Sequence, residues 1–169
     1  MAGTVTTWLE EIAAYWRREF PERDFSRNRA LLLLSRLSFL MPAFQKESLR
    51  ALGLTPSDYS ILGALRRAGG PRQLAPEDLY TALHCTPGGL TKMVERLEKQ
   101  GLVQRSNDPG DRRRSRIRLT SQGAAVERKA FTEYNASADQ LLGRLSPDEL
   151  AQVDAALELL VRCFEENTE

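Results

Sequence analysis

One stretch, residues 84–120, constrains the fold most, because it holds the start and end signals of a helix followed by those of a hairpin. Thr86 is a good N-cap residue, and Pro87 suits the first helical position, where its missing N–H costs no hydrogen bond. Four apolar residues then recur at helical spacing: Leu90, Met93, Val94 and Leu97. Gly101 is typical of the left-handed residue that ends a helix. The sequence therefore predicts a helix over 87–100.

The residues after this helix predict two strands joined by a basic turn. Residues 102–105 form a plausible strand, and the sequence DPGD at 108–111 is a strong turn signal. Ile117 and Leu119 alternate with arginines, as in a half-exposed returning strand. A helix of this kind can enter a major groove while an arginine-rich tip reaches the adjacent backbone or minor groove. The pattern therefore favours DNA binding, although an isolated arginine run is more often a solvated surface.

The segment GLVQRSNDPGDRRRSRIRLTSQG resembles the wing signature of the MarR family of winged-helix transcription regulators. Asp111 and Arg113 match its D-x-R element, and Leu119, Thr120 and Gly123 match its LTxxG element. The wing, the helix before it and the short helix before that occur in the family's order, within residues 30–165. The resemblance implies a winged helix-turn-helix that binds double-stranded DNA, with the helix over 87–100 as the reading helix.

The resemblance implies two groups of DNA-contacting residues. The reading helix should contribute Thr86, Gly88, Thr91, Lys92 and Arg96, and the wing should contribute Asp111, Arg112, Arg113 and Arg114. We expect Arg113 to enter or border the minor groove, its two neighbouring arginines to hold phosphates, and Asp111 to orient an arginine.

The distribution of charge supports this interpretation better than the total does. The formal net charge is only +1. Residues 92–118, however, carry nine Lys and Arg against four Asp and Glu, whereas residues 127–169 carry four against ten. A local positive patch on a nearly neutral protein can bind phosphates without binding every anionic surface.

The remaining periodicity predicts a mainly α fold with a small β-hairpin wing and helical dimerisation regions from both termini. The expected helices cover residues 6–20, 28–51, 55–68, 76–83, 87–100, 120–142 and 147–164. We expect three segments: N-terminal helices (1–52) for dimerisation and a ligand-pocket wall, the DNA-binding lobe (53–120), and C-terminal dimerisation helices (121–169). The helix over 28–51 is apolar on more than one side, which favours a homodimer. Pro42 predicts a kink or break near Leu40–Met41.

The N-terminal sequence AAYWRREFPERDFS and the leucine-rich helix after it are similar to the PecS/HucR branch of the family. The branch implies a response to urate or to another small aromatic or lipophilic effector. Ser60 stands where urate responders carry an aspartate, which argues against urate itself. The candidate ligand-binding residues are Trp16, which matches a pocket tryptophan of the branch, and Arg36, Phe39, Phe44 and Tyr59. Core or interface packing is an equal alternative for each.

The two cysteines, Cys85 and Cys163, cannot form a disulfide framework or a zinc site. Cys85 precedes the reading helix, so thiol-based redox sensing is one alternative, and packing of a small buried thiol is another. His84 is the only histidine, and no phosphate loop or nucleophile–histidine pattern is present. We therefore expect no catalytic residues, no metal and no cofactor, and not an enzyme. A ligand-independent architectural DNA-binding protein is a further alternative.

The N-terminal sequence carries no basic region before an apolar run, and Glu10 and Glu11 interrupt it. The apolar run over 30–41 is too short for a membrane span and contains Arg36. We expect a cytoplasmic protein without membrane contact. The resulting hypothesis is a ligand-responsive homodimeric repressor that binds a pseudo-palindromic operator.

Overall fold

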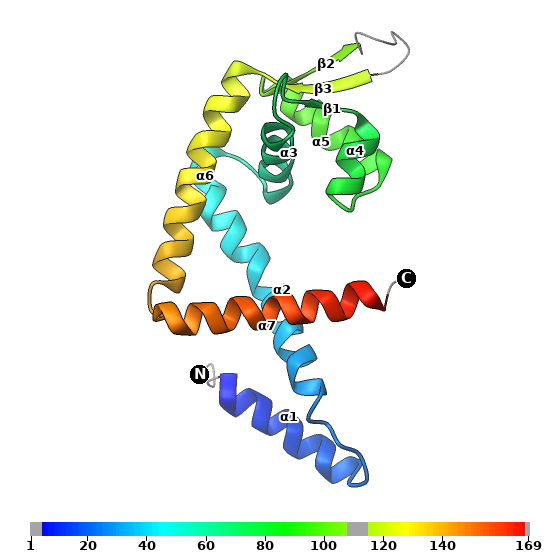
Figure 1. Cartoon of the computed structure of the whole chain (residues 1–169), viewed down its shortest axis with the longest axis vertical. Helices are drawn as coiled ribbons and strands as arrows, with labels where there is room; N and C mark the ends of the chain where they lie inside the picture. The colour runs from blue at the N-terminus through cyan, green and yellow to red at the C-terminus, as the bar shows by residue number, and fades with distance from the viewer. Residues whose placement is uncertain (1–4, 108–114, 168–169) are drawn as a thin grey trace. The chain divides into compact units, whose positions relative to one another are not determined.

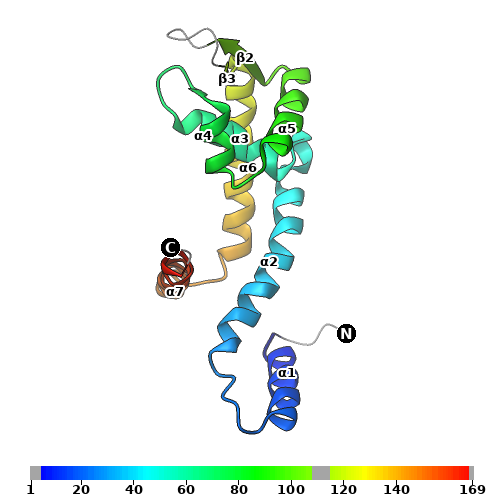
Figure 2. The same ribbon diagram turned by 90° about the vertical axis from the view of Figure 1, so that its right-hand side faces the viewer.

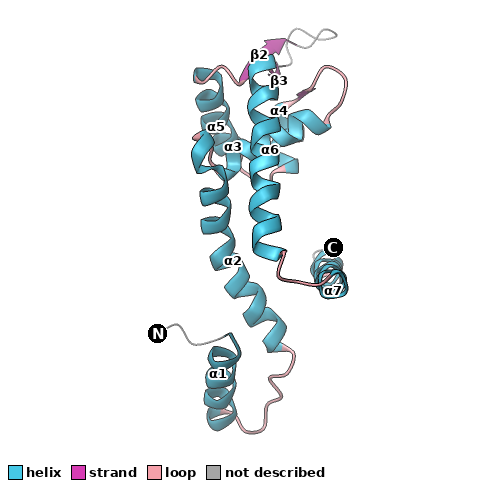
Figure 3. Cartoon of the chain, turned by 90° about the vertical axis from the view of Figure 1, so that its left-hand side faces the viewer, coloured by secondary structure: helices cyan, strands magenta, loops and turns pink. Residues whose placement is uncertain are grey.

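The structure is a computed structural model that describes residues 5–107 and 115–167, and helices dominate it (Figures 1 and 3). Its elements in chain order are α1 (Val5–Glu19), α2 (Asn28–Leu49), the 3₁₀ turn η1 (Arg50–Leu52), α3 (Pro56–Arg67), β1 (Gln73–Leu74), α4 (Pro76–Ala82), α5 (Pro87–Lys99), β2 (Val103–Asn107), β3 (Ser115–Leu119), α6 (Ser121–Leu142) and α7 (Pro147–Glu166). The prediction of a mainly α fold with a β-hairpin wing is confirmed.

The chain divides into two compact units, Met1–Glu47 and Ser48–Glu169. The three segments predicted from the sequence differ from this division, because the C-terminal helices group with the winged lobe. The long helix α6 packs along α3, and this contact joins the two parts of the second unit. Each unit is described separately below.

The winged lobe of the second unit has its core where α3, α4 and α5 meet a small antiparallel sheet (Figure 2). The strand order is β1-β3-β2, with Leu74 opposite Ile117 and Val103 opposite Leu119. The largest fully buried apolar side chains of this core are Leu49, Ile61, Leu62, Leu65, Leu79, Val94, Leu97 and Ile117. The sequence did not predict β1, because a two-residue strand is too short to show alternation.

The predicted boundaries of the reading helix are confirmed. The Thr86 hydroxyl accepts a hydrogen bond from the backbone N–H of Gly89 at 3.2 Å, and Pro87 occupies the first turn. Gly101 has a φ of +71°, the left-handed conformation that the sequence predicted for the residue ending the helix. Gln100, immediately before it, is the C-cap.

The LTxxG element fixes the start of α6 against the end of α5. The Thr120 hydroxyl donates to the Gly101 carbonyl at 2.7 Å and accepts from the Gly123 N–H at 2.9 Å. The Thr120 N–H donates to the Leu102 carbonyl at 3.1 Å. A Cβ atom at position 123 would overlap that carbonyl, so the close approach of helix and loop requires glycine here.

The N-terminal unit is a helical hairpin in which residues 20–27 connect α1 to α2 (Figure 3). Leu9 is buried, and the Arg36 guanidinium lies 5.1 Å from the centre of a ring of Trp8. Of the predicted kink or break at Pro42, the break does not occur, since α2 runs through this proline as one helix, and the kink stays a prediction. A proline inside a helix removes one backbone hydrogen bond, and the helix continues here despite that loss.

Several helices leave large apolar side chains exposed. On α2 they are Leu31, Leu37, Phe39, Leu40 and Met41, and on α7 they are Leu150, Val153, Leu157, Leu159, Val161 and Phe164. No residue of α7 between Pro147 and Glu166 is buried. Even so, no described helix combines the length and the apolar character that crossing a membrane requires.

Candidate nucleic-acid interface

Helix α5 has one buried and one exposed face. Leu90, Val94 and Leu97 are buried in the core of the lobe. Four of the predicted DNA contacts are exposed to solvent: Thr86 at the N-cap, and Gly88, Thr91 and Lys92 in the first two turns. The structure therefore brings these four residues together on one exposed surface at the N-terminal half of the helix.

This surface offers both small and cationic groups. The Thr91 hydroxyl donates to the Pro87 carbonyl at 3.0 Å, which leaves its methyl group and oxygen lone pair accessible. The space that a Cβ atom at Gly88 would occupy is open, with nothing within 4 Å, so another molecule can approach the Gly88 backbone closely. Lys92 has no ion pair or hydrogen bond with the described part of the chain. An exposed ammonium without an internal partner is available to a phosphate or a base edge.

Arg96, also predicted to contact DNA, is engaged within the lobe. Its Nη2 lies 2.6 Å from Oδ1 of Asp58 and 3.0 Å from the Thr55 hydroxyl, and its Nε also donates to Asp58 at 3.1 Å. Asp58 is only 1% exposed. This geometry favours a role in holding α5 against the start of α3, and the prediction that Arg96 touches DNA stays a prediction.

The structure describes the wing along its two strands, β2 and β3. Arg105 on β2 forms an ion pair with Glu98 at 3.1 Å, and Arg118 on β3 is exposed opposite Gln104. The four predicted wing contacts, Asp111, Arg112, Arg113 and Arg114, lie outside the described residues.

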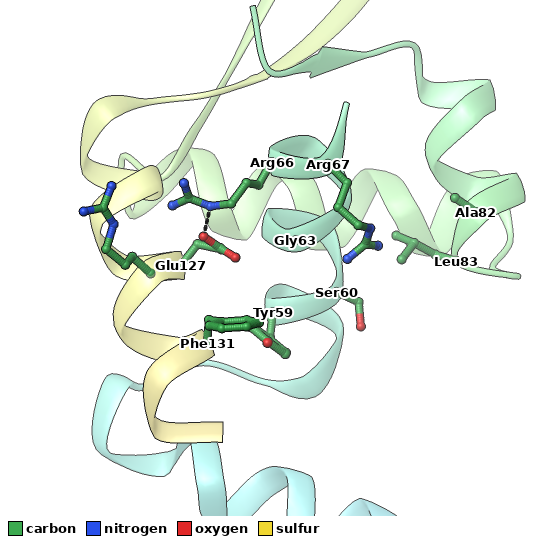
Figure 4. A pocket seen from close by; sticks show the side chains of 10 residues that line it. Tyr59, Ser60, Gly63, Arg66, Arg67, Ala82, Leu83, Glu127 and Phe131 are labelled. Carbon is green, nitrogen blue, oxygen red and sulfur yellow. Dashed lines mark hydrogen bonds and ion pairs between the residues drawn. The ribbon is translucent and has the colours of Figure 1, made fainter. Parts of the chain in front are cut away.

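A cavity of about 540 Å³ lies between α3, α4 and α6 of the same unit (Figure 4). Tyr59 and Phe131 form an aromatic wall on one side, and Ala82 and Leu83 lie across from them at the end of α4. Polar groups come from Ser60, Arg66, Arg67, Glu127 and Arg128. An apolar wall with a few converging polar groups is typical of a small-molecule site.

Contacts within the lobe hold three of the lining side chains in place: Arg66, Glu127 and Tyr59. Arg66 forms an ion pair with the buried carboxylate of Glu127 and also donates to the Ala124 carbonyl, which ties α3 to α6. The Tyr59 ring stacks on Tyr134, with ring centres 5.4 Å apart. Burial, and then the negative charge of Glu127, raises the pKa of Tyr59, so its phenol stays protonated and can donate a hydrogen bond.

The other predicted ligand residues belong to the N-terminal unit. Trp16 lines a cavity within the N-terminal hairpin, Arg36 stacks on Trp8, and Phe39 is 80% exposed. Phe44 is half-buried on α2. Tyr59 is therefore the only one of the five that lines the cavity of the winged lobe as it is described.

Sequence reasoning missed Arg66 and Glu127 as cavity residues. One signal for Glu127 was present: it shares the buried stripe of α6 with Gly123 and Ala130, at helical spacing. An acidic residue on an inward stripe indicates a buried basic partner. Which basic residue pairs with it depends on the packing of α3 on α6, which periodicity does not specify.

The turn before the reading helix contains His84 and Cys85. His84 is exposed and has a φ of +48°, a left-handed conformation that is uncommon for a non-glycine residue. Cys85 is half-buried, and Cys163 is exposed on α7. Within the described residues, no group of three or more His, Cys, Asp and Glu side chains could hold a metal ion.

Comparison with known proteins identifies relatives that share between about half and most of this chain. A sequence profile described as MarR family matches residues 52–114. The transcriptional regulator PecS of Dickeya dadantii (strain 3937) is 30% identical over 149 residues, which cover 88% of this chain and 90% of that protein. The transcriptional regulator HosA of Escherichia coli O111:H- is 34% identical over 96 residues, covering 57% of this chain and 69% of HosA.

Among solved structures, too, the chain is similar to MarR family regulators. AbsC, a MarR family transcriptional regulator from Streptomyces coelicolor, superposes with a TM-score of 0.71 at 26% identity, covering 85% of this chain and 97% of AbsC. A cysteine-to-serine mutant of MarR from E. coli, crystallised with operator DNA, superposes with a TM-score of 0.67 at 25% identity, covering 86% of this chain and 96% of MarR.

Proposed function

The chain belongs to the MarR family of DNA-binding transcription regulators, and we propose that it acts as a homodimeric repressor. In this proposal it binds a pseudo-palindromic operator and is released when a small aromatic or lipophilic molecule binds. The cytoplasm, where genomic DNA is accessible, is the proposed compartment.

The exposed face of α5 is the observation that carries the DNA-binding part of the proposal. It presents Thr91 and Lys92 on a helix whose opposite face is anchored in the core. The similar E. coli MarR mutant was crystallised with operator DNA, which supports the same use of this lobe here. We propose that Thr86, Gly88, Thr91 and Lys92 contact the major groove, while the wing residues Asp111 to Arg114 reach the backbone and minor groove.

The exposed apolar faces of α2 and α7 support a homodimer. Apolar patches of this extent are uncommon on monomeric proteins, because their exposure to water is unfavourable. On α7, Leu150, Val153, Leu157 and Phe164 recur at helical spacing and form one continuous stripe. A second copy of the chain would cover such stripes and would supply the second reading helix that a two-fold symmetric operator requires.

The cavity between α3, α4 and α6 is the proposed effector site. Its volume of about 540 Å³ lies within the range of roughly 300–1,000 Å³ usual for small-molecule pockets. The tyrosine and phenylalanine suit an aromatic body, while the arginines suit an acidic substituent. Leu83 lies three residues before the N-cap of the reading helix. A ligand against Leu83 therefore presses on the helix that precedes α5, and this is the proposed route to release.

The experiment begins by selecting bound fragments from sheared genomic DNA. We expect the selected fragments to share a sequence with two-fold symmetry. Fragments without such symmetry would contradict binding to a pseudo-palindromic operator as a homodimer. Gel-shift titrations on one selected operator, with a panel of aromatic and acyl metabolites, then identify compounds that release the protein.

A cavity-filling variant assigns the release to this cavity. Ser60→Phe places an aromatic ring in the cavity and should abolish release while DNA affinity without the compound stays within about twofold of the parent value. Ser57→Phe is the matched control, because Ser57 is exposed on the same helix and does not line the cavity. If Ser60→Phe responds like the parent protein, the effector binds elsewhere.

A further inference from the structure

The small sheet of the winged lobe has two unlike faces. Leu74, Val103, Ile117 and Leu119 face the core that the sheet shares with α3, α4 and α5 (Figure 1). Because side chains alternate along a strand, the residues between them lie on the opposite, outer face. That outer face carries only polar and cationic residues: Gln73, Gln104, Ser106, Arg116 and Arg118.

Arg118 occupies the centre of this outer face. It lies on the middle strand β3, opposite Gln73 of β1 on one side and Gln104 of β2 on the other. Residues directly opposite each other on one face of an antiparallel sheet have Cβ atoms roughly 4.5–5.5 Å apart. Two carboxamide groups therefore flank one guanidinium. Arg118 is exposed and has no ion pair or hydrogen bond with the described residues.

The charge at this end of the sheet is not neutralised in the way that a neighbouring arginine is. Arg105, on the other face of β2, forms an ion pair with Glu98 at 3.1 Å. None of the five residues of the outer face is acidic. Arg72 adds another exposed cation beside β1, where its carbonyl accepts a hydrogen bond from the Leu119 N–H at 2.9 Å. The outer face therefore complements a polyanion.

The composition of this face suits a phosphate backbone better than a protein surface. Arginine, glutamine and serine side chains are among the groups that bind phosphate oxygens in protein–DNA complexes. The cores of protein–protein interfaces are instead enriched in aromatic and apolar residues, and the outer face has none of either. The sheet also belongs to the lobe that carries the reading helix, since β2 packs against α5.

We propose that the outer face of the sheet binds the phosphate backbone of DNA that flanks the operator, with Arg118 as its central contact. This face points away from α5, so a duplex lying along α5 meets it only beyond the base pairs that α5 contacts. The inference rests on the proposed function. It adds a contact separate from those assigned to the reading helix and to residues Asp111 to Arg114.

The test compares two DNA fragments that contain the same selected operator. The short fragment ends at the symmetric sequence, and the long one adds about ten base pairs, one helical turn, on each side. Fluorescence anisotropy at low salt should show that the parent protein binds the long fragment about three- to tenfold more tightly. Arg118→Gln should lose most of this gain and still bind the short fragment within about twofold of the parent value. On the long fragment its slope of log K against log salt should fall by about 0.9 for each phosphate released.

Two further variants separate a local contact from general effects of charge and folding. Arg144→Gln removes the same charge from an exposed position between α6 and α7 and should keep the parent gain. Gln104→Glu places a carboxylate opposite Arg118, where the two side chains can pair across the strands. It should therefore lose the gain while its midpoint of urea denaturation stays at or above the parent value.

The remaining outcomes contradict the proposal in distinguishable ways. Equal losses on both fragments for Arg118→Gln would place its contact within the operator and would overturn the assignment to flanking DNA. No loss on either fragment would overturn DNA binding by this face and would indicate an acidic protein as its partner. An equal loss of the gain in Arg144→Gln would show general electrostatic attraction and would also overturn the site. If the parent protein fails to bind even the short fragment, the proposed function itself fails, and this inference fails with it.

Discussion

Asp58 at the start of α3 and Arg96 near the end of α5 form an ion pair with an Nη2–Oδ1 distance of 2.6 Å. The carboxylate is buried, and its second oxygen accepts hydrogen bonds from the backbone N–H and hydroxyl of Thr55 at 2.9 and 2.8 Å. One aspartate therefore completes the capping box of α3 and fixes the reading helix to it. The orientation of α5 depends on a polar contact as well as on its apolar stripe.

Replacing Arg96 with leucine should destabilise the fold by about 2–4 kcal/mol, because the buried Asp58 loses its charged partner. Arg105→Leu is the matched control. Arg105 also pairs with a carboxylate, but its ion pair with Glu98 is exposed, and loss of such a pair costs less than about 1 kcal/mol. Urea denaturation followed by circular dichroism measures both values. Equal stability losses in the two variants would contradict a structural role for Arg96.

DNA affinity should depend on Lys92 and on Arg113. Alanine at either position should weaken binding to every DNA sequence and lower the slope of log K against log salt by about 0.9 for each phosphate that the side chain neutralises in the parent complex. Lys129→Ala, an exposed lysine on α6, should leave both quantities unchanged. Fluorescence anisotropy over a series of salt concentrations measures affinity and slope together. An unchanged slope for Lys92→Ala would mean that this lysine binds no phosphate.

The assembly should depend on the apolar stripe of α7. Leu157→Glu places a charge at the middle of the stripe, where a partner helix would bury it, and the cost of burying an unpaired charge should favour the monomer. Gln152→Glu changes charge at an exposed polar position of the same helix and should keep the parent state. Light scattering coupled to size exclusion measures the molar mass. A Leu157→Glu variant with the parent mass would exclude this stripe from the interface.

Local signals were sufficient to predict the helices, the hairpin and the caps, because Thr86, Pro87 and Gly101 act through their own backbone conformations. Long-range partners were not predictable in the same way. Asp58 has the sequence context of an N-terminal cap and also fulfils that role, so nothing in its neighbourhood indicates Arg96, which lies 38 residues later. At Pro42 the local rule predicted a kink or a break, and the helix continues through the proline without a break.

The candidate sites show the same difference between local signals and long-range packing. Helical spacing correctly grouped Thr91 and Lys92 on one exposed face of α5. The two cavities depend on how helices pack within each unit, which helical spacing does not specify. Trp16 lines the cavity of the N-terminal hairpin and Tyr59 that of the winged lobe, and a single shared pocket stays a prediction.

Two glycines of the winged lobe should respond in opposite directions to the same substitution. Gly123→Ala should destabilise the fold by about 1–3 kcal/mol, because the new methyl group would overlap the Leu102 carbonyl and force α6 away from α5. Gly88→Ala meets no atom within 4 Å and should stabilise the protein by about 0.5–1 kcal/mol, because alanine loses less conformational entropy in a helix. Urea denaturation gives both values, and gel shifts give the effect on DNA binding. If Gly88 allows close approach of a groove, Gly88→Ala should bind DNA more weakly although it is more stable, whereas parallel gains in stability and affinity would remove Gly88 from the interface.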